Sequence, residues 1–183
     1  MNMKIKAIIG LFSFALMLAT AFVAYNALLD TVDAPDNITG NTGALQRAPD
    51  FVMEDGDGNE IWLSDFLGQP IVLNFWATWC PACVQETPHF ENLYQNSNGE
   101  IKVLKVNLIT SRRETRDAVD AFMEAGGYSF PLYFDITGEG AMAYSVQFIP
   151  ITFFINPEGY VAAKAQGAVD ESILNNGVNM ILS

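Results

Sequence analysis

The 183 residues predict an α/β domain whose central mixed sheet is flanked by helices. Residues 71–77, 101–109 and 151–155 are short runs of mainly β-branched, aromatic and other apolar residues, the pattern of strands buried on both faces. Helix-forming segments follow the first two runs, and turn signals at residues 55–59 and 156–159 predict antiparallel hairpins. Strands of both orientations therefore share the predicted sheet.

The domain is predicted to open with a hairpin, a buried strand and a helix. Residues 51–53 and 60–63 flank the Gly- and Asp-rich turn and form the N-terminal hairpin. The strand over residues 71–77 leads to a helix over residues 81–94, because the fixed φ of Pro81 suits the first helical position.

The second half of the domain continues the alternation of strands and helices. Ser111 and Glu114 have the spacing of a capping box, which predicts a helix that runs to about Ala125 and ends at Gly126 and Gly127. The remaining predicted elements are a strand over 130–134, a helix over 139–144, strands over 151–155 and 160–165, and a helix from its N-cap Asp170 to about Leu182.

The N-terminus predicts a membrane anchor over residues 1–29. Lys4 and Lys6 precede an uncharged apolar run of 23 residues, 7–29. As a helix this run is about 34 Å long, enough to cross a hydrocarbon core of about 30 Å. Because lysines mark the cytoplasmic side, the rest of the chain is expected outside the cytoplasm, with the protein in the cell membrane as a single-pass protein. The alternative is a cleaved signal peptide, for which residues 19–21, Ala-Thr-Ala, offer a cleavage site.

Two further segments follow from composition. Residues 30–46 contain Pro, Gly, Asn, Thr and Asp and predict a flexible linker, so the folded domain is expected over residues 47–183. All 21 acidic residues but only seven of the nine basic residues follow the apolar run, which gives the exported part a net charge of −14. This balance argues against nucleic acid as a partner.

The only two cysteines, Cys80 and Cys83, are predicted to form a redox pair. Cys80 is expected at a helix N-terminus, where amide N–H groups and the helix dipole stabilise a thiolate. Cys83, one turn further, lies on the same helical face and is more shielded. Cys80 would attack a substrate disulfide, and Cys83 would resolve the mixed disulfide. A zinc site would need a second Cys pair, which the sequence lacks. A purely structural disulfide bridge is the remaining alternative.

The order of elements and the motif Trp-Cys-Pro-Ala-Cys at the first βα junction resemble the thioredoxin fold. The sequence is most similar to the membrane-anchored TlpA/ResA-type thiol-disulfide oxidoreductases. The motifs that carry this resemblance are Ala-Pro-Asp-Phe at 48–51, Asn-Phe-Trp-Ala-Thr-Trp-Cys at 74–80, Glu-Thr-Pro at 86–88, and Ile-Pro-Ile-Thr-Phe-Phe-Ile-Asn-Pro-Glu-Gly at 149–159. The resemblance implies a thioredoxin-like domain with a βα insertion over about residues 112–134.

The resemblance also implies roles for residues near the cysteine pair. Pro150 matches the cis-proline that faces the pair, which would leave the backbone of Ile149 free to pair with an extended substrate segment. Glu86 matches an acidic residue near the active site. Its position three residues beyond Cys83 independently suits a carboxylate that accepts the Cys83 proton. Asn74 stands where ordinary thioredoxins have a buried Asp, which makes Glu86 the leading proton acceptor.

Residues on either side of Cys80 are expected to contact the substrate. Trp79 offers an apolar surface beside the thiolate. Together with it, the predicted substrate-binding residues are Pro81, Ala82, Ile149 and Pro150.

The predicted function is an extracytoplasmic thiol-disulfide oxidoreductase that reduces protein disulfides, with cytochrome c maturation as one expected use. It needs no cofactor and no metal, and a membrane-embedded thiol donor would regenerate the dithiol. The Pro81-Ala82 pair differs from the Gly-Pro and Glu-Pro of reducing relatives and leaves a thiol oxidase as an alternative.

Two further alternatives belong to other functional classes. A peroxiredoxin-like peroxidase would need Thr three residues before the reactive cysteine, where this chain has Ala77. A non-enzymatic copper-handling module would use the two cysteines and His89, the only histidine.

Overall fold

The computed structural model describes residues 13, 16–24, 38–40, 46–110 and 113–182. The chain divides into two units, residues 1–36 and residues 37–183. Residues 16–24 of the first unit are helical. Within the described part of the chain, no helix is long and apolar enough to span a membrane. Most of the predicted anchor lies outside the described residues.

The second unit contains one sheet, to which nine strands of the described residues belong. They are β1 (Ile38–Gly40), β2 (Gln46–Arg47), β3 (Val52–Asp55), β4 (Glu60–Trp62), β5 (Ile71–Trp76), β6 (Lys102–Asn107), β7 (Leu132–Phe134), β8 (Ile151–Ile155) and β9 (Tyr160–Gln166). Their order across the sheet is β1-β9-β8-β5-β6-β7-β3-β4, and β2 also pairs with β9.

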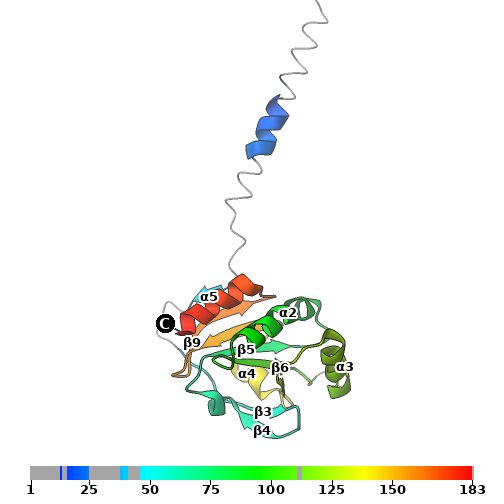
Figure 1. Cartoon of the computed structure of the whole chain (residues 1–183), viewed down its shortest axis with the longest axis vertical. Helices are drawn as coiled ribbons and strands as arrows, with labels where there is room; N and C mark the ends of the chain where they lie inside the picture. The colour runs from blue at the N-terminus through cyan, green and yellow to red at the C-terminus, as the bar shows by residue number, and fades with distance from the viewer. Residues whose placement is uncertain (1–12, 14–15, 25–37, 41–45, 111–112, 183) are drawn as a thin grey trace, which may run out of the picture. The chain divides into compact units, whose positions relative to one another are not determined.

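The sheet is mixed, as the sequence predicts. β5, β6 and β7 run parallel to one another at its centre. The flanking pairs β5 with β8, β8 with β9, β7 with β3 and β3 with β4 are antiparallel. The N-terminal hairpin β3–β4 therefore extends the sheet beyond β7 (Figure 1).

Helices cover both faces of the sheet, as the alternation of residues along β5 requires. Ile71, Leu73 and Phe75 lie in one apolar cluster, whereas Val72 and Trp76 belong to clusters on the opposite face. That opposite face is covered by α2 (Pro81–Asn96), α3 (Arg116–Gly126) and α5 (Glu171–Leu182), and α4 (Glu139–Ala143) packs on the first face (Figure 1). All six residues of β5 are buried, which confirms the predicted central strand.

The structure differs from the prediction within the expected linker. Residues 38–40 and 46–47 form β1 and β2, both antiparallel to β9, so these two pieces belong to the sheet and not to a free tether. Pairing at a sheet edge uses backbone N–H and C=O groups, which polar residues also supply. The rest of the expected linker lies outside the described residues.

The predicted start of α3 is also wrong. The helix begins at Arg116, and the hydroxyl group of Thr115 accepts a hydrogen bond from the N–H of Ala118 as its N-cap. Glu114 therefore does not lie in the first turn and caps no helix. The predicted end is confirmed, since Gly127 is the left-handed C-cap, with φ of 64°.

Candidate active site

Cys80 and Cys83 form a disulfide at the start of α2, with their Cα atoms 5.2 Å apart. Cys80 is the N-cap of this helix, Pro81 follows it, and the Cys80 sulfur accepts a hydrogen bond of 3.2 Å from the N–H of Cys83. The helix N-terminus therefore points one of its free amides at the sulfur of Cys80. Cys80 is 5% exposed and Cys83 is completely buried. Only Cys80 is open to attack from solvent.

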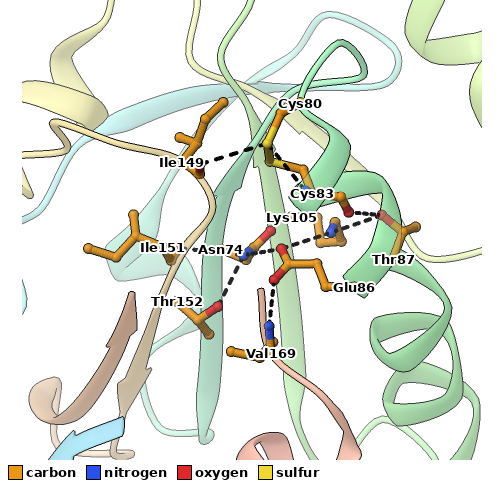
Figure 2. A network of polar contacts seen from close by, with 10 residues as sticks. All are labelled: Asn74, Cys80, Cys83, Glu86, Thr87, Lys105, Ile149, Ile151, Thr152 and Val169. Atoms are coloured by element: carbon orange, nitrogen blue, oxygen red, sulfur yellow. Dashed lines mark hydrogen bonds and ion pairs between the residues drawn. A yellow bond between two sulfur atoms is a disulfide. The ribbon is translucent and has the colours of Figure 1, made fainter. Parts of the chain in front are cut away.

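The loop before β8 lies against Cys80. The Ile149–Pro150 peptide bond is cis, as predicted. The carbonyl oxygen of Ile149 is 3.7 Å from the Cys80 sulfur (Figure 2). Pro150 is buried and Ile149 is half-buried. Ile149 therefore lies at the disulfide, as the sequence predicts, and Pro150 follows it in the chain.

Exposed apolar residues flank both Cys80 and Ile149 in the sequence. Trp79 is 45% exposed and directly precedes Cys80, and Phe148 is 74% exposed and directly precedes Ile149. Pro81 is also exposed, and Ala82 is half-buried. The chain next to both residues therefore offers exposed apolar surface to a polypeptide.

Glu86 lies below the disulfide, completely buried between α2 and the sheet (Figure 2). One carboxylate oxygen accepts a hydrogen bond of 2.9 Å from the side-chain amide of Asn74, and the other accepts one of 3.1 Å from the N–H of Val169. The Asn74 amide also donates to the hydroxyl group of Thr152, at 3.1 Å. Asn74 and Glu86 are therefore partners, and Glu86 is not the exposed acid of a surface helix.

Sequence reasoning missed Lys105, which lies on β6 and is completely buried. Its ammonium nitrogen is 3.8 Å from the Glu86 carboxylate and 3.4 Å from the Thr87 hydroxyl group. Three aromatic rings surround this ammonium group. The distances from the nitrogen to the ring centroids are 4.9 Å for Trp76, 4.2 Å for Phe90 and 5.8 Å for Phe130.

One sequence signal could have found Lys105. A lysine in the middle of a strand predicted to be buried on both faces needs an anionic partner. Glu86 is the acid that the neighbouring helix presents to it. The pairing itself depends on how α2 packs on β6, which the local sequence does not specify.

Burial changes the protonation of both members of this pair. Burial raises the pKa of Glu86 from 4.5 to about 7, against the opposing effects of the Lys105 charge and the hydrogen bonds from Val169 and Asn74. Burial also lowers the pKa of Lys105 from 10.5 to about 8, against the opposing effect of the Glu86 charge. A proton can therefore bind and leave this site near neutral pH.

The predicted role of Glu114 in a capping box is also wrong. Its side chain is almost completely buried and accepts hydrogen bonds from the N–H and the hydroxyl group of Thr78, each at 2.8 Å. The side-chain amide of Asn107 donates a third, at 2.6 Å. Glu114 therefore contacts the turn that leads into Cys80.

His89, which the copper-binding alternative requires, lies elsewhere on α2. It is half-buried and borders a hollow together with Asn92 and Glu171, and neither cysteine borders this hollow.

Comparisons with known proteins agree with the chemistry of this site. The AhpC/TSA family model matches residues 44–164. The thiol-disulfide oxidoreductase ResA of Bacillus subtilis (strain 168) is 38% identical over 135 residues, which cover 73% of this chain and 73% of ResA. ResA of Halalkalibacterium halodurans is 34% identical over 139 residues, 75% of this chain and 77% of that protein.

A solved structure gives the same picture of the fold. The crystal structure of StoA from Bacillus subtilis matches with a TM-score of 0.62 and 29% identity, covering 70% of this chain and 96% of that one. The predicted thioredoxin-like fold is confirmed. The chain therefore belongs to the AhpC/TSA family and, within it, to the ResA-like thiol-disulfide oxidoreductases.

Proposed function

We propose that the enzyme reduces protein disulfides outside the cytoplasm. The observation that carries the direction of electron flow is the environment of the Cys80 sulfur. Among the described residues its two polar contacts are the Cys83 N–H and the Ile149 carbonyl oxygen, and neither is a charged group. A strong oxidant stabilises the thiolate of its reduced form, whereas here the carbonyl oxygen opposes the thiolate that the single N–H favours. The reduced enzyme is therefore expected to give up its electrons readily.

The reaction begins on Cys80, the more accessible cysteine. Its thiolate attacks one sulfur of a substrate disulfide, the substrate S–S bond breaks, and the departing sulfur leaves as a thiolate that takes a proton. Enzyme and substrate are then joined by a mixed disulfide. Trp79, Pro81, Ala82, Ile149 and Pro150 hold the substrate segment, and the Ile149 backbone pairs with it as an added strand.

Cys83 completes the reaction with the help of Glu86. The Cys83 thiol gives its proton to the Glu86 carboxylate, one helical turn away, and the resulting thiolate attacks the Cys80 sulfur. The mixed disulfide breaks, the second substrate sulfur leaves as a thiolate that takes a proton from water, and the Cys80–Cys83 disulfide forms. Two electrons have moved to the substrate. A pKa near 7 suits Glu86 to accept and return a proton at neutral pH.

The place of the reaction follows from the N-terminal sequence. An uncharged run over residues 7–29, preceded by Lys4 and Lys6, anchors the enzyme in the cell membrane with its domain outside. A membrane-embedded thiol donor beside the anchor reduces the Cys80–Cys83 disulfide again. The cysteines of apocytochrome c are among the substrates we propose, because haem attachment to cytochrome c needs both cysteines of its attachment motif as free thiols.

A redox titration of the full chain tests the direction. We expect a potential near the reducing end of thioredoxin-like proteins, about −270 mV for thioredoxin, whereas a value near about −120 mV, as in a strong oxidant, would reverse the assignment. The reduced protein should also cleave the disulfides of insulin, and Cys80→Ser should abolish this activity. Turnover driven by peroxide would instead favour the peroxidase.

A further inference from the structure

The carboxylate of Glu114 is buried without a cationic partner among the described residues. Its side chain is only 3% exposed, and three neutral donors replace its hydration. One oxygen accepts from the Thr78 N–H and from the Asn107 side-chain amide, and the other accepts from the Thr78 hydroxyl group. A buried carboxylate is tolerated only when such donors satisfy it, so its position is tightly defined.

Two of these three donors belong to Thr78, in the turn that joins β5 to α2. The turn is closed by one backbone hydrogen bond, from the Cys80 N–H to the Ala77 carbonyl, at 3.3 Å. Both hydrogen-bond donors of Thr78 point instead to Glu114, which comes from the segment between β6 and α3. Glu114 therefore holds the turn in place from a distant part of the chain.

The next residue in this turn, Trp79, is the apolar side chain beside the reactive cysteine. With an exposed fraction of 45%, it has enough free surface to contact a substrate. Among the described residues the Trp79 side chain makes no hydrogen bond and no ring contact, so its place at the surface depends on where the backbone of the turn carries it.

We propose that Glu114 is a positioning residue that holds Trp79 for docking of an apolar polypeptide segment next to the target disulfide. This inference rests on the proposed reduction of protein disulfides. Small disulfides that reach Cys80 without covering Trp79 do not need this contact. Glu114 thus makes the enzyme selective for polypeptide disulfides over small ones.

The test compares two substrates in the full chain, insulin and the small disulfide hydroxyethyl disulfide. Glu114→Ala is expected to lower kcat/KM for insulin about tenfold, mainly through a higher KM, and to change the rate with the small disulfide less than about twofold. Trp79→Ala should also lower kcat/KM for insulin, to about the same extent. Both changes remove the same interaction, the contact between Trp79 and the substrate. The double variant should therefore lose no more insulin activity than either single variant.

Further variants separate positioning from general damage to the fold. Glu114→Gln can still accept from the Thr78 N–H and can donate to its hydroxyl group, so it should keep at least about half of the insulin activity. Thr78→Val removes the hydroxyl donor and should give an intermediate loss. Glu124→Ala, an exposed acid on α3, serves as the control and should leave both activities unchanged.

Three results would overturn the inference. They are an equal loss with both substrates in Glu114→Ala, additive losses in the double variant, and a loss in Glu114→Gln as large as in Glu114→Ala. Each of them leaves the proposed function intact as long as the unmodified enzyme reduces insulin. Failure of the unmodified enzyme to reduce either substrate would instead contradict the proposed function.

Discussion

The Lys105 ammonium nitrogen lies 3.8 Å from the Glu86 carboxylate, and both side chains are completely buried beneath the active-site disulfide. A buried ion pair of this kind does little for net stability, because the desolvation of both charges offsets their attraction. Its position one helical turn below Cys83 gives it a different use (Figure 2). We propose that it provides the proton site for Cys83, because burial raises the pKa of Glu86 to about 7.

Glu86→Gln removes the proton acceptor without changing its shape. At pH 7 we expect the reduction of insulin to slow by about 10²-fold. The deficit should shrink from pH 7 toward pH 9, because hydroxide then removes the Cys83 proton without help from a carboxylate. Stopped-flow kinetics over this pH range give the measurement, with the exposed Glu100→Gln as control. A deficit that is the same at every pH would argue against a role in proton transfer.

Lys105→Met keeps an unbranched apolar chain in the aromatic surroundings but removes the charge. The Lys105 charge lowers the pKa of Glu86, so its loss should raise that pKa further above about 7. The titration midpoint of the Glu86 carboxyl carbon, followed by NMR, should move upward, and the pH profile of insulin reduction should move with it. Lys102→Met, on the same strand, should move neither. An unchanged midpoint in Lys105→Met would mean that Lys105 does not act on Glu86.

The same pair predicts how stability depends on pH. With a native pKa of about 7 against 4.5 when unfolded, Glu86 binds a proton in the native state that the unfolded state has already lost. Its contribution to the free energy of unfolding therefore falls as pH rises from 4.5 to about 7, by up to about 1.4 kcal/mol per pH unit. Lys105 has a lowered native pKa, so its contribution rises between about 8 and 10.5.

The two contributions together place a minimum in this part of the stability between about pH 7 and pH 8. Denaturant unfolding from pH 5 to pH 10 measures it. Subtracting the curve of the double variant Glu86→Gln/Lys105→Met isolates the pair. A difference curve that is flat with pH would show that neither group titrates as proposed.

Gly177 on α5 is a packing position independent of the chemistry. A Cβ atom added there would lie 2.2 Å from the ring of Phe154 on β8. Gly177→Ala should therefore destabilise the protein by about 1 to 3 kcal/mol despite the higher helix propensity of Ala. Gly56→Ala, whose added Cβ meets no atom within 4 Å, should be nearly neutral. Denaturant unfolding compares the two, and equal stability would contradict the packing of α5 against β8.

Much of the fold and the centre of the site could be predicted because they depend on local patterns. The strand before Cys80, the proline after it and the turn residues at 55–59 and 156–159 each act over a few residues. The structure confirms the hairpins, the central strands and the cis bond before Pro150.

The errors and omissions involve segments that meet only in the folded chain. Glu114 has the local spacing of a capping box, but in the structure its carboxylate accepts hydrogen bonds from Thr78 and Asn107 instead. Lys105 finds Glu86 because β6 and α2 pack together. The strands β1 and β2 pair with β9 through backbone groups, and no side-chain pattern predicts this pairing.

The central claim is that Cys80 attacks the substrate and Cys83 releases it. Its most direct test mixes oxidised insulin with reduced Cys83→Ser, with reduced Cys80→Ser as the comparison, and identifies covalent adducts by mass spectrometry. The account predicts a stable mixed disulfide through Cys80 in Cys83→Ser, because no second thiol can break it, and almost none in Cys80→Ser, since Cys83 is completely buried. An adduct that forms faster through Cys83 than through Cys80 would contradict it.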